Sequence, residues 1–162
     1  MDTILDAQTR QRYLPERYAG FWLRFGAFVI DCIVLMFLSW IFSFILEVIM
    51  FKIIGVDFLA QFEKETLLAG VIGSYAIWYL GCILICVFME SSKFQATPGK
   101  MAVGIKVGDS VGNRITFSAS LCRMLGKLIS TILIGFGFIM IGWDTKKQGL
   151  HDKLAATFVF EP

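Results

Sequence analysis

The stretch YAGFWLRFGAFVIDCIVLMFLSWIF, residues 18–42, decides the fold because it is apolar enough to enter a bilayer and yet carries Arg24 and Asp31. On an α-helix, seven residues make two turns and about 10 Å of rise, so these two side chains point the same way. Arg24 is long enough to reach the lipid headgroups, whereas Asp31 is not. Inserting a carboxylate into the hydrocarbon part of a bilayer costs on the order of 2.5–3.5 kcal/mol. We therefore expect Asp31 to face protein or water and to have a partner.

The composition excludes a soluble globular protein of this size. Of the 162 residues, 57% are hydrophobic and only 17% are charged, which is too little polar surface to cover the chain, and the mean hydropathy is +0.71. The first twenty residues mix acidic and basic side chains and lack the apolar core of a cleaved signal peptide. We therefore expect an all-α, multi-pass integral membrane protein with a single membrane domain over residues 1–162.

The apolar runs predict two full transmembrane helices and a shorter third segment. After a tail over residues 1–17, the first helix is expected over residues 18–50 and the second, which carries no charge, over residues 67–89. Residues 119–143 begin with two basic side chains on one face, Arg123 and Lys127. Only sixteen uncharged residues follow, interrupted by Gly135 and Gly137. Such a segment fits a short, glycine-broken or re-entrant helix as well as a third crossing.

Two features of the second helix concern its packing. Small residues gather near its beginning, with Ala69-xxx-Gly73 and Gly70-xxx-Ser74 pairs that allow close helix approach, so we expect the first helix to dock there. The aromatic residues near its middle lie too deep for the headgroup region. Their polar atoms are therefore expected to find partners inside the bundle. These residues are Tyr75, Trp78 and Tyr79.

The polar interval over residues 90–118 predicts a small β-hairpin. After the turn signal Pro98-Gly99, apolar side chains alternate from Met101 to Val107, and the chain can turn and return as a second strand over Arg114–Phe117. The carboxy-terminal segment, residues 144–162, ends in a β-like run from Thr157 to Phe160. This run is expected to join the hairpin as a further strand.

Basic residues near the apolar ends predict the topology. They are sparsest in the connection between the first two helices, so the amino terminus and the hairpin region are expected to be cytoplasmic. The basic carboxy-terminal segment also favours the inside, which requires an even number of crossings and supports the re-entrant interpretation of residues 119–143. We expect the protein to lie in a bacterial inner membrane.

Three motifs in this order resemble the RDD family of small membrane proteins. They are YAGFWLRFGAFVID (residues 18–31), ATPGKMAVGIKV with the following GNRITF (residues 96–117), and KKQGLHDKLAATFVF (residues 146–160). The resemblance makes Arg24, Asp31 and Asp152 the arginine and two aspartates after which the family is named. It also implies a role in transport, since some members resemble cation–proton exchangers. Ala156 departs from the pattern, because a glycine is common there, and Gly149 stands where Thr or Ser is often seen.

The charged trio has two interpretations. As a transport protein, possibly a cation/proton exchanger, the chain would work as a homo-oligomer with Asp31 as the proton or cation site, and His151 would be a second group titrating near neutrality. Alternatively, it is a non-transporting membrane scaffold or accessory subunit that binds another membrane protein, and Arg24, Asp31 and Asp152 form a structural ionic cluster. In both cases we expect the trio to converge, with Arg24 engaging both carboxylates.

Other classes of function are not indicated. The loops hold no nucleophile and base in a catalytic pattern, so we expect no enzyme. Cys82 and Cys86 share a helix face without a His or further Cys nearby, so we expect neither a metal site nor a cofactor. We expect the protein to be surrounded by a lipid bilayer and to bind no nucleic acid. A third possible function is the binding of a lipid or other amphiphile beside Trp78.

Overall fold

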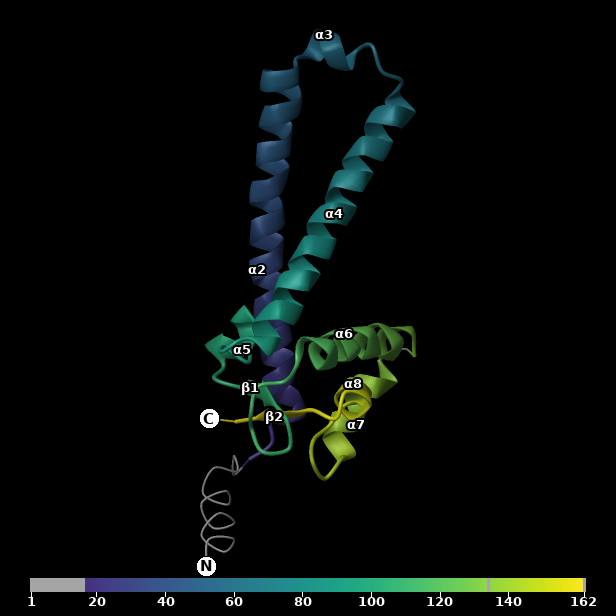
Figure 1. Ribbon diagram of the computed structural model, residues 1–162. Coiled ribbons are helices and arrows are strands. Elements are labelled where there is room, and N and C mark those ends of the chain that lie inside the picture. Colours follow the sequence, from purple (N-terminus) through teal and green to yellow (C-terminus); the bar gives the residue numbers. More distant parts are fainter. Residues whose placement is uncertain (1–16, 134, 162) are drawn as a thin grey trace, which may run out of the picture. The chain divides into compact units, whose positions relative to one another are not determined.

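The computed structural model describes residues 17–133 and 135–161, and Figure 1 labels its elements. The chain divides into two compact units, one formed by residues up to Asp31 together with Cys86–Pro162, the other by Cys32–Ile85. The elements in chain order are α2 (Phe21–Val48), the π-helix η1 (Ile49–Ile54), α3 (Val56–Leu59), α4 (Lys64–Ser91), α5 (Pro98–Ala102), β1 (Lys106–Gly108), α6 (Phe117–Ile132), α7 (Phe136–Trp143), α8 (Leu150–Leu154) and β2 (Phe158–Phe160).

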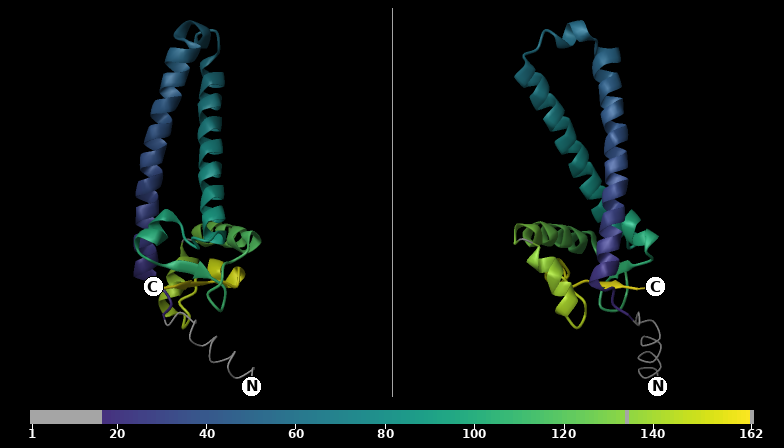
Figure 2. Two further views of the ribbon diagram at one scale, coloured as in Figure 1. Left: turned by 60° about the vertical axis from the view of Figure 1, so that its left-hand side comes forward. Right: turned by 180° about the vertical axis from the view of Figure 1, so that it is seen from behind.

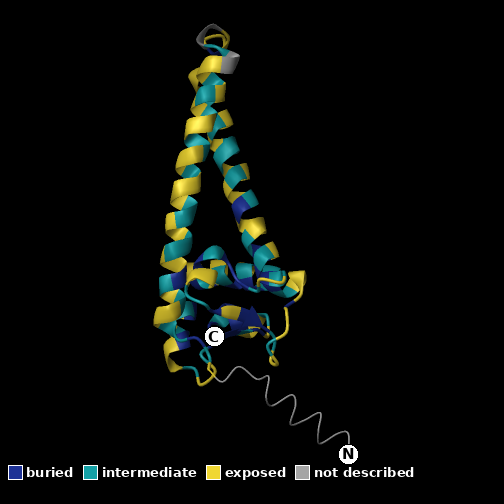
Figure 3. Cartoon of the chain, turned by 90° about the vertical axis from the view of Figure 1, so that its left-hand side faces the viewer, coloured by how far each residue is buried: buried dark blue, intermediate teal, exposed yellow. Residues whose placement is uncertain are grey.

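Among the described residues, two helices are long and apolar enough to cross a membrane, as predicted. They are α2 with its π-helical extension, over Phe21–Lys52, and α4, over Lys64–Ser91. Each has 28 α-helical residues, or roughly 42 Å at 1.5 Å per residue, which exceeds a hydrocarbon core of about 30 Å. Exposed and half-buried residues follow one another along both helices (Figure 3). In the most apolar 18-residue window of the first, no residue is buried, so these side chains need lipid or protein around them.

The unit formed by residues 32–85 is joined by polar and aromatic contacts, as expected for the deep aromatic residues of α4. The Tyr75 hydroxyl lies 2.5 Å from Ser43 Oγ, and Trp78 Nε1 donates to Ser39 Oγ at 3.4 Å. The Trp78 ring stacks on Phe42 with 4.6 Å between centroids. These contacts satisfy polar atoms that would otherwise be unpaired in an apolar surrounding.

The small-residue end of α4 does not dock the first helix, contrary to the prediction. A Cβ added at Gly70 or Gly73 would have no atom within 4 Å. Gly70 instead lines an apolar hollow with residues from the end of α2, from η1 and from α3. The small residues permit close approach but do not by themselves choose the surface that approaches. Among the described residues, this end of α4 is uncovered.

In the other unit, the first strand pairs with the end of the chain rather than with a hairpin partner. β1 and β2 form a two-stranded antiparallel sheet in which Val107 lies opposite Val159. The expected joining of the terminal run is confirmed, but Arg114–Phe117 forms no return strand, and Pro98–Ala102 is the short helix α5. Proline at the first turn of a helix lacks only an N–H that would be unbonded anyway. The first residues of the alternating apolar segment therefore belong to helix α5, and the strand begins only at Lys106.

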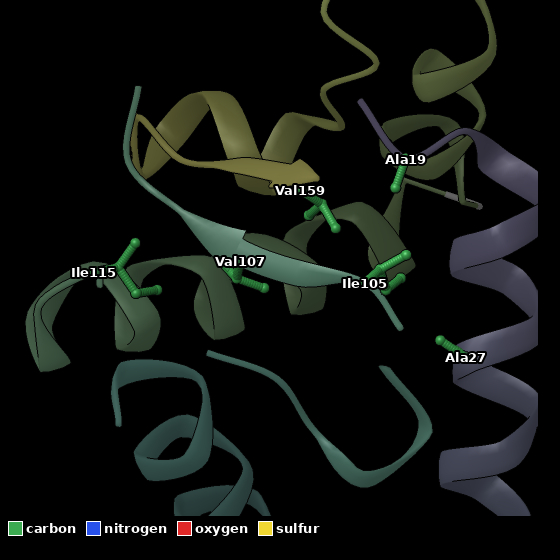
Figure 4. Packing of buried hydrophobic residues seen from close by; sticks show 6 residues of the cluster. All are labelled: Ala19, Ala27, Ile105, Val107, Ile115 and Val159. Atoms are coloured by element: carbon green, nitrogen blue, oxygen red, sulfur yellow. The ribbon is translucent and has the colours of Figure 1, made fainter. Parts of the chain in front are cut away.

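The core of this unit is small and joins three parts of the chain. Ala19 and Ala27 come from the beginning of the chain, Ile105 and Val107 from the β1 region, and Val159 from β2, and all five are at most 1% exposed. Figure 4 shows these side chains together with Ile115. The segment before α2 also adds to the sheet, since Ala19 N donates to Val159 O at 2.8 Å.

The third apolar segment is a bent pair of helices, in agreement with the glycine-broken prediction. α6 and α7 bend by more than 40° at their junction, where Gly135 has the left-handed φ of 78°. A residue with a Cβ adopts that conformation only at a cost, so the glycine permits the turn. α8 packs against both helices, and Figure 2 shows the three beside the strands from two directions.

Pairing between the two ends of the chain constrains how often it crosses a membrane. Tyr18, just before α2, forms a bridge with Phe160 of β2, so both residues lie on the same side. If α2 and α4 each cross once, the bent α6–α7 pair begins and ends on one side of the membrane and is not a third crossing. This is the re-entrant arrangement that the basic carboxy-terminal segment favoured.

Ala156, which stands where a glycine is common in the motif, adopts a backbone conformation that a glycine would favour. Ala156 has a φ of 50°, in the left-handed region, where a residue with a Cβ costs roughly 1–2 kcal/mol. A glycine there would avoid the strain. The turn between α8 and β2 forms nonetheless, because Thr157 N donates to Asp152 O at 2.9 Å.

Candidate functional site

Arg24 lies in the first turn of α2 and uses its guanidinium group to join three parts of the chain. Its Nε donates to Ala19 O at 2.9 Å, its Nη1 donates to the Asp152 carboxylate, and its Nη2 donates to Lys147 O at 2.6 Å. The planar fork of an arginine suits several acceptors at once, which a lysine ammonium would not match. Arg24 therefore fixes the start of α2 to the segment that carries α8.

Asp152 receives a second arginine that the sequence analysis did not assign to the site. Arg123 Nη2 of α6 lies 2.9 Å from Asp152 Oδ1, and both side chains are at most 1% exposed. Burial would raise the pKa of Asp152, but the charges of Arg123 and Arg24 outweigh it and hold that pKa below its usual range. Asp152 is therefore an ionised carboxylate shared by two guanidinium groups.

Glu90, at the end of α4, is the centre of a second group of charges. It is 2% exposed and pairs with Lys100 of α5. Lys127 of α6 lies 3.3 Å from it and Arg123 Nη1 lies 3.7 Å away. Burial lowers the pKa of Lys100 to about 7, against the opposing effect of Glu90. Arg123 thus links the Asp152 and Glu90 groups into one network.

Asp31 fixes a different element from the one that Arg24 engages. Thr97 Oγ1 donates to Asp31 Oδ2 at 2.6 Å, and Gly99 N donates to Oδ1 at 2.6 Å. The carboxylate therefore caps the start of α5, where backbone N–H groups have no partner within the helix. A Cβ added at Gly99 would lie 2.0 Å from Ala27 O and 2.8 Å from Asp31 Cγ. The ATPGK motif thus supplies a hydroxyl, a helix-starting proline and a residue small enough to rest on α2.

The structure brings together two members of the predicted trio and places the third elsewhere. Arg24 and Asp152 form an ion pair, whereas among the described residues no hydrogen bond or ion pair joins Asp31 to either. The seven-residue spacing placed both α2 charges on one face, but Asp31 lies two turns further along the helix and meets α5 there. Arg24 therefore does not engage both carboxylates.

Sequence reasoning missed the network residues Glu90, Lys100 and Arg123. A signal was available for the first, because Glu90 directly ends a charge-free apolar run and begins a polar interval. Arg123 and Lys127 were recognised as one face of a helix, but no partner was assigned to that face. In α6 the polar side is the inner one: Ser120, Arg123 and Ser130 are buried, while Leu125, Leu128 and Ile132 are exposed.

His151 is buried beside the network and does not titrate near neutrality, contrary to the prediction. It is 4% exposed and lies against the Phe138 ring, with 5.3 Å between centroids. Burial lowers its pKa to about 3, because the positive charges of Arg123, Lys127 and Arg24 add to desolvation and outweigh the attraction of Asp152. A neutral imidazole is therefore the form that the fold accommodates.

This burial predicts that the protein loses stability in mild acid. The unfolded histidine takes up a proton near pH 6.5 and the folded one only near pH 3, so stability should fall as pH drops below about 6.5. The expected slope is about 1.4 kcal/mol per pH unit between pH 6 and pH 4. Asp152, whose folded pKa is lowered, adds an acid loss only below about pH 4.

The measurement is the free energy of unfolding of purified protein in detergent at pH 7, 6, 5 and 4. His151 is the chain's only histidine, so His151→Gln should remove most of the slope above pH 4. An equal slope in wild type and His151→Gln would contradict the assignment.

A cavity of about 480 Å³ lies beside the network. Arg24 and Asp31 of α2 line it, as do Lys100, Arg123 and His151. It lies wholly within the unit that contains the sheet. In the described part of the chain, no cluster of three or more His, Cys, Asp or Glu residues is arranged to hold a metal ion.

Comparison with known proteins gives a consistent result. The sequence profile of the RDD family matches residues 18–156. The uncharacterized protein YxaI of Bacillus subtilis strain 168 is 33% identical over 148 residues, which cover 89% of this chain and 97% of YxaI. The uncharacterized membrane protein YteJ of the same strain is 29% identical over 148 residues, which cover 90% of this chain and 82% of YteJ. No solved structure matches.

Proposed function

Since this chain belongs to the RDD family of membrane proteins, we propose that it is a non-catalytic scaffold or accessory subunit of a membrane complex. In this function Arg24, Asp31 and Asp152 hold the fold together and transport nothing. The observation that carries the proposal is that each of the three charges is engaged by protein groups.

The bonding of Asp31 supports the structural role most directly. Each carboxylate oxygen already accepts a hydrogen bond of 2.6 Å, one from a hydroxyl and one from a backbone N–H. A cation bound at Asp31 would have to share the carboxylate with these two donors and would weaken their hold on the start of α5. Buried ionic groups often specify one arrangement of a fold rather than add stability, which is the requirement for a rigid scaffold.

The uncovered end of α4 is the surface that we assign to a membrane partner. Ala69 and Gly70 are exposed there, and a Cβ added at Gly70 or Gly73 would have no atom of this chain within 4 Å. Small residues let the backbone of another helix approach closely in a bilayer. A transmembrane helix of a partner protein fits this surface.

Substitution of Gly70 tests this function. Gly70→Leu should leave the fold intact and abolish co-purification of a defined larger complex in mild detergent, because the added side chain keeps the partner helix away. The matched control is Ile72→Phe, which enlarges an exposed residue on the opposite face of α4. Equal recovery of the complex with Gly70→Leu and wild type would contradict the proposed surface.

A second function is favoured by one observation, namely that Asp31 and Lys100 line the same cavity. Burial brings the pKa of Lys100 to about 7, so this lysine would exchange protons near neutral pH. In this alternative the chain is a cation/proton exchanger that works as a homo-oligomer, with Asp31 as its cation or proton site.

Flux measurements separate the two functions. Proteoliposomes that contain the purified protein are given a proton gradient, and exchange against Na⁺, K⁺ or Li⁺ is followed by an internal pH dye. The scaffold function predicts no flux above that of protein-free vesicles. Flux that disappears in Asp31→Asn, with folded yield retained, would favour the exchanger and overturn the first proposal.

The orientation is part of the same proposal. We place the amino terminus and the sheet in the cytoplasm of a bacterial cell, with α2 and α4 crossing the inner membrane, because basic residues are sparsest between these two helices. The orientation is measured by introducing a cysteine at the exposed position Lys106 and labelling it with a thiol reagent that is applied to one side of the membrane. Labelling by a reagent applied from outside would show that the sheet lies outside and would contradict the proposed orientation.

A further inference from the structure

The geometry points to the 480 Å³ cavity as a binding site for an anionic amphiphile, with its phosphate held by Arg123 and Lys127 and its apolar tail along the phenylalanines of α2. The inference goes beyond the scaffold function and does not depend on it, because an accessory subunit and an exchanger would both possess the cavity.

Unpartnered donors of Arg123 are the first observation. This side chain is 1% exposed and lines the cavity, yet within the described chain its Nε and Nη1 atoms have no hydrogen-bond acceptor. Glu90 Oε2 lies 3.7 Å from Nη1, which is beyond hydrogen-bond distance. Leaving such donors unpaired in a buried position is costly, so a ligand that offers acceptors there would be stabilised.

The balance of charge determines the sign of the ligand. Four basic side chains line the cavity, and they share three carboxylates in and around it, so basic groups outnumber acidic groups by one. The basic residues are Arg24, Lys100, Arg123 and Lys127, and the acidic ones are Asp31, Glu90 and Asp152. Lys127 is the group best able to change partners, because its side chain is 37% exposed. A phosphate offers acceptors to a guanidinium fork and to an ammonium together.

The other residues that line the cavity are mostly apolar, which suits a ligand that also has an apolar part. Phe25, Phe28 and Ile139 line the cavity and are exposed on the surface of the unit, so the cavity opens between apolar side chains. A volume of about 480 Å³ is within the range of pockets for small organic ligands. Basic pockets beside membrane helices suit lipid headgroups.

The test uses full-length protein in neutral detergent, with lysophosphatidic acid as the probe. Binding is measured by native mass spectrometry and by the shift of the unfolding temperature on titration. Inorganic phosphate and lysophosphatidylcholine are titrated in parallel, the first with the charge and no tail, the second with the tail and no net charge. We expect saturable binding of lysophosphatidic acid at one site, and at least tenfold weaker binding of both comparison compounds.

Two variants locate the site. Lys127→Gln removes one cavity charge without touching the buried Arg123–Asp152 pair, and should weaken binding about tenfold. Lys106→Gln removes the same charge from the exposed face of β1, outside the cavity, and should change binding less than twofold. Thr131→Trp narrows the cavity without any change of charge and should reduce binding as strongly as Lys127→Gln.

Three outcomes would overturn the inference. They are equal loss in Lys127→Gln and Lys106→Gln, unchanged binding in Thr131→Trp, and inorganic phosphate binding as tightly as lysophosphatidic acid. The first would indicate attraction by overall charge, the second a site elsewhere, and the third a site for a free anion.

Discussion

Gly99→Ala is expected to abolish the folded protein, because the position has no space for a single methyl group. The added Cβ would lie 2.0 Å from Ala27 O and 2.9 Å from Asp31 N, both backbone atoms of α2. A helix backbone cannot move aside locally, so α5 would have to leave α2. It would then lose the hydrogen bond from Gly99 N to Asp31.

The expected loss is about 3 kcal/mol or more, the upper end for overpacking of a core. It is measured as the yield of monodisperse protein after size-exclusion chromatography and as the unfolding temperature in detergent. Gly26→Ala is the matched control, since a Cβ at that position of α2 meets no atom within 4 Å. Folded Gly99→Ala protein with wild-type stability would show that α5 does not rest on α2 as described.

Asp152→Ala is expected to have the second large effect, because it leaves two guanidinium groups without their carboxylate. Arg24 and Arg123 both pair with Asp152, and all three side chains are at most 9% exposed. Removing one partner of a buried ion pair costs roughly 3–5 kcal/mol, mainly because the other charge remains buried. The variant should therefore unfold at a markedly lower denaturant concentration.

A double-mutant cycle on Arg24→Gln and Asp152→Asn separates this contact from other effects of the two substitutions. We expect the double variant to be more stable than the sum of the single losses predicts, because Arg24 is then no longer buried as a charge without its carboxylate. Arg123 loses the same carboxylate in the single and the double Asp152 variant, so that loss cancels from the cycle. The exposed pair of Lys153 and Asp144, 2.5 Å apart, is the comparison. There Lys153→Ala should cost no more than about 1 kcal/mol. Additive effects for Arg24 and Asp152 would mean that their ion pair contributes nothing.

The amino-acid sequence by itself determined the class of the protein and its long elements. A run as apolar as residues 18–42 has no stable place in water, and the hydrophobic effect acts on each run independently of the rest of the fold. For that reason α2, α4 and the break at Gly135 were predictable. The pairing of the last strand was also predictable, because its β-like run had to bond its backbone to something.

Only the tertiary structure decided which charges meet. Helix periodicity gives the face on which Arg24 and Asp31 lie, but the partner depends on which element packs at each level of that face. Asp152 arrives at one level and Gly99 at the other. The same limit applied to α6, where Arg123 and Lys127 were visible as one stripe. A polar stripe can face water or a buried carboxylate. Here it faces Glu90 and Asp152, which lie 33 positions before Arg123 and 29 after it. Ionic contacts across such separations depend on the packing of the whole unit, which no local pattern encodes.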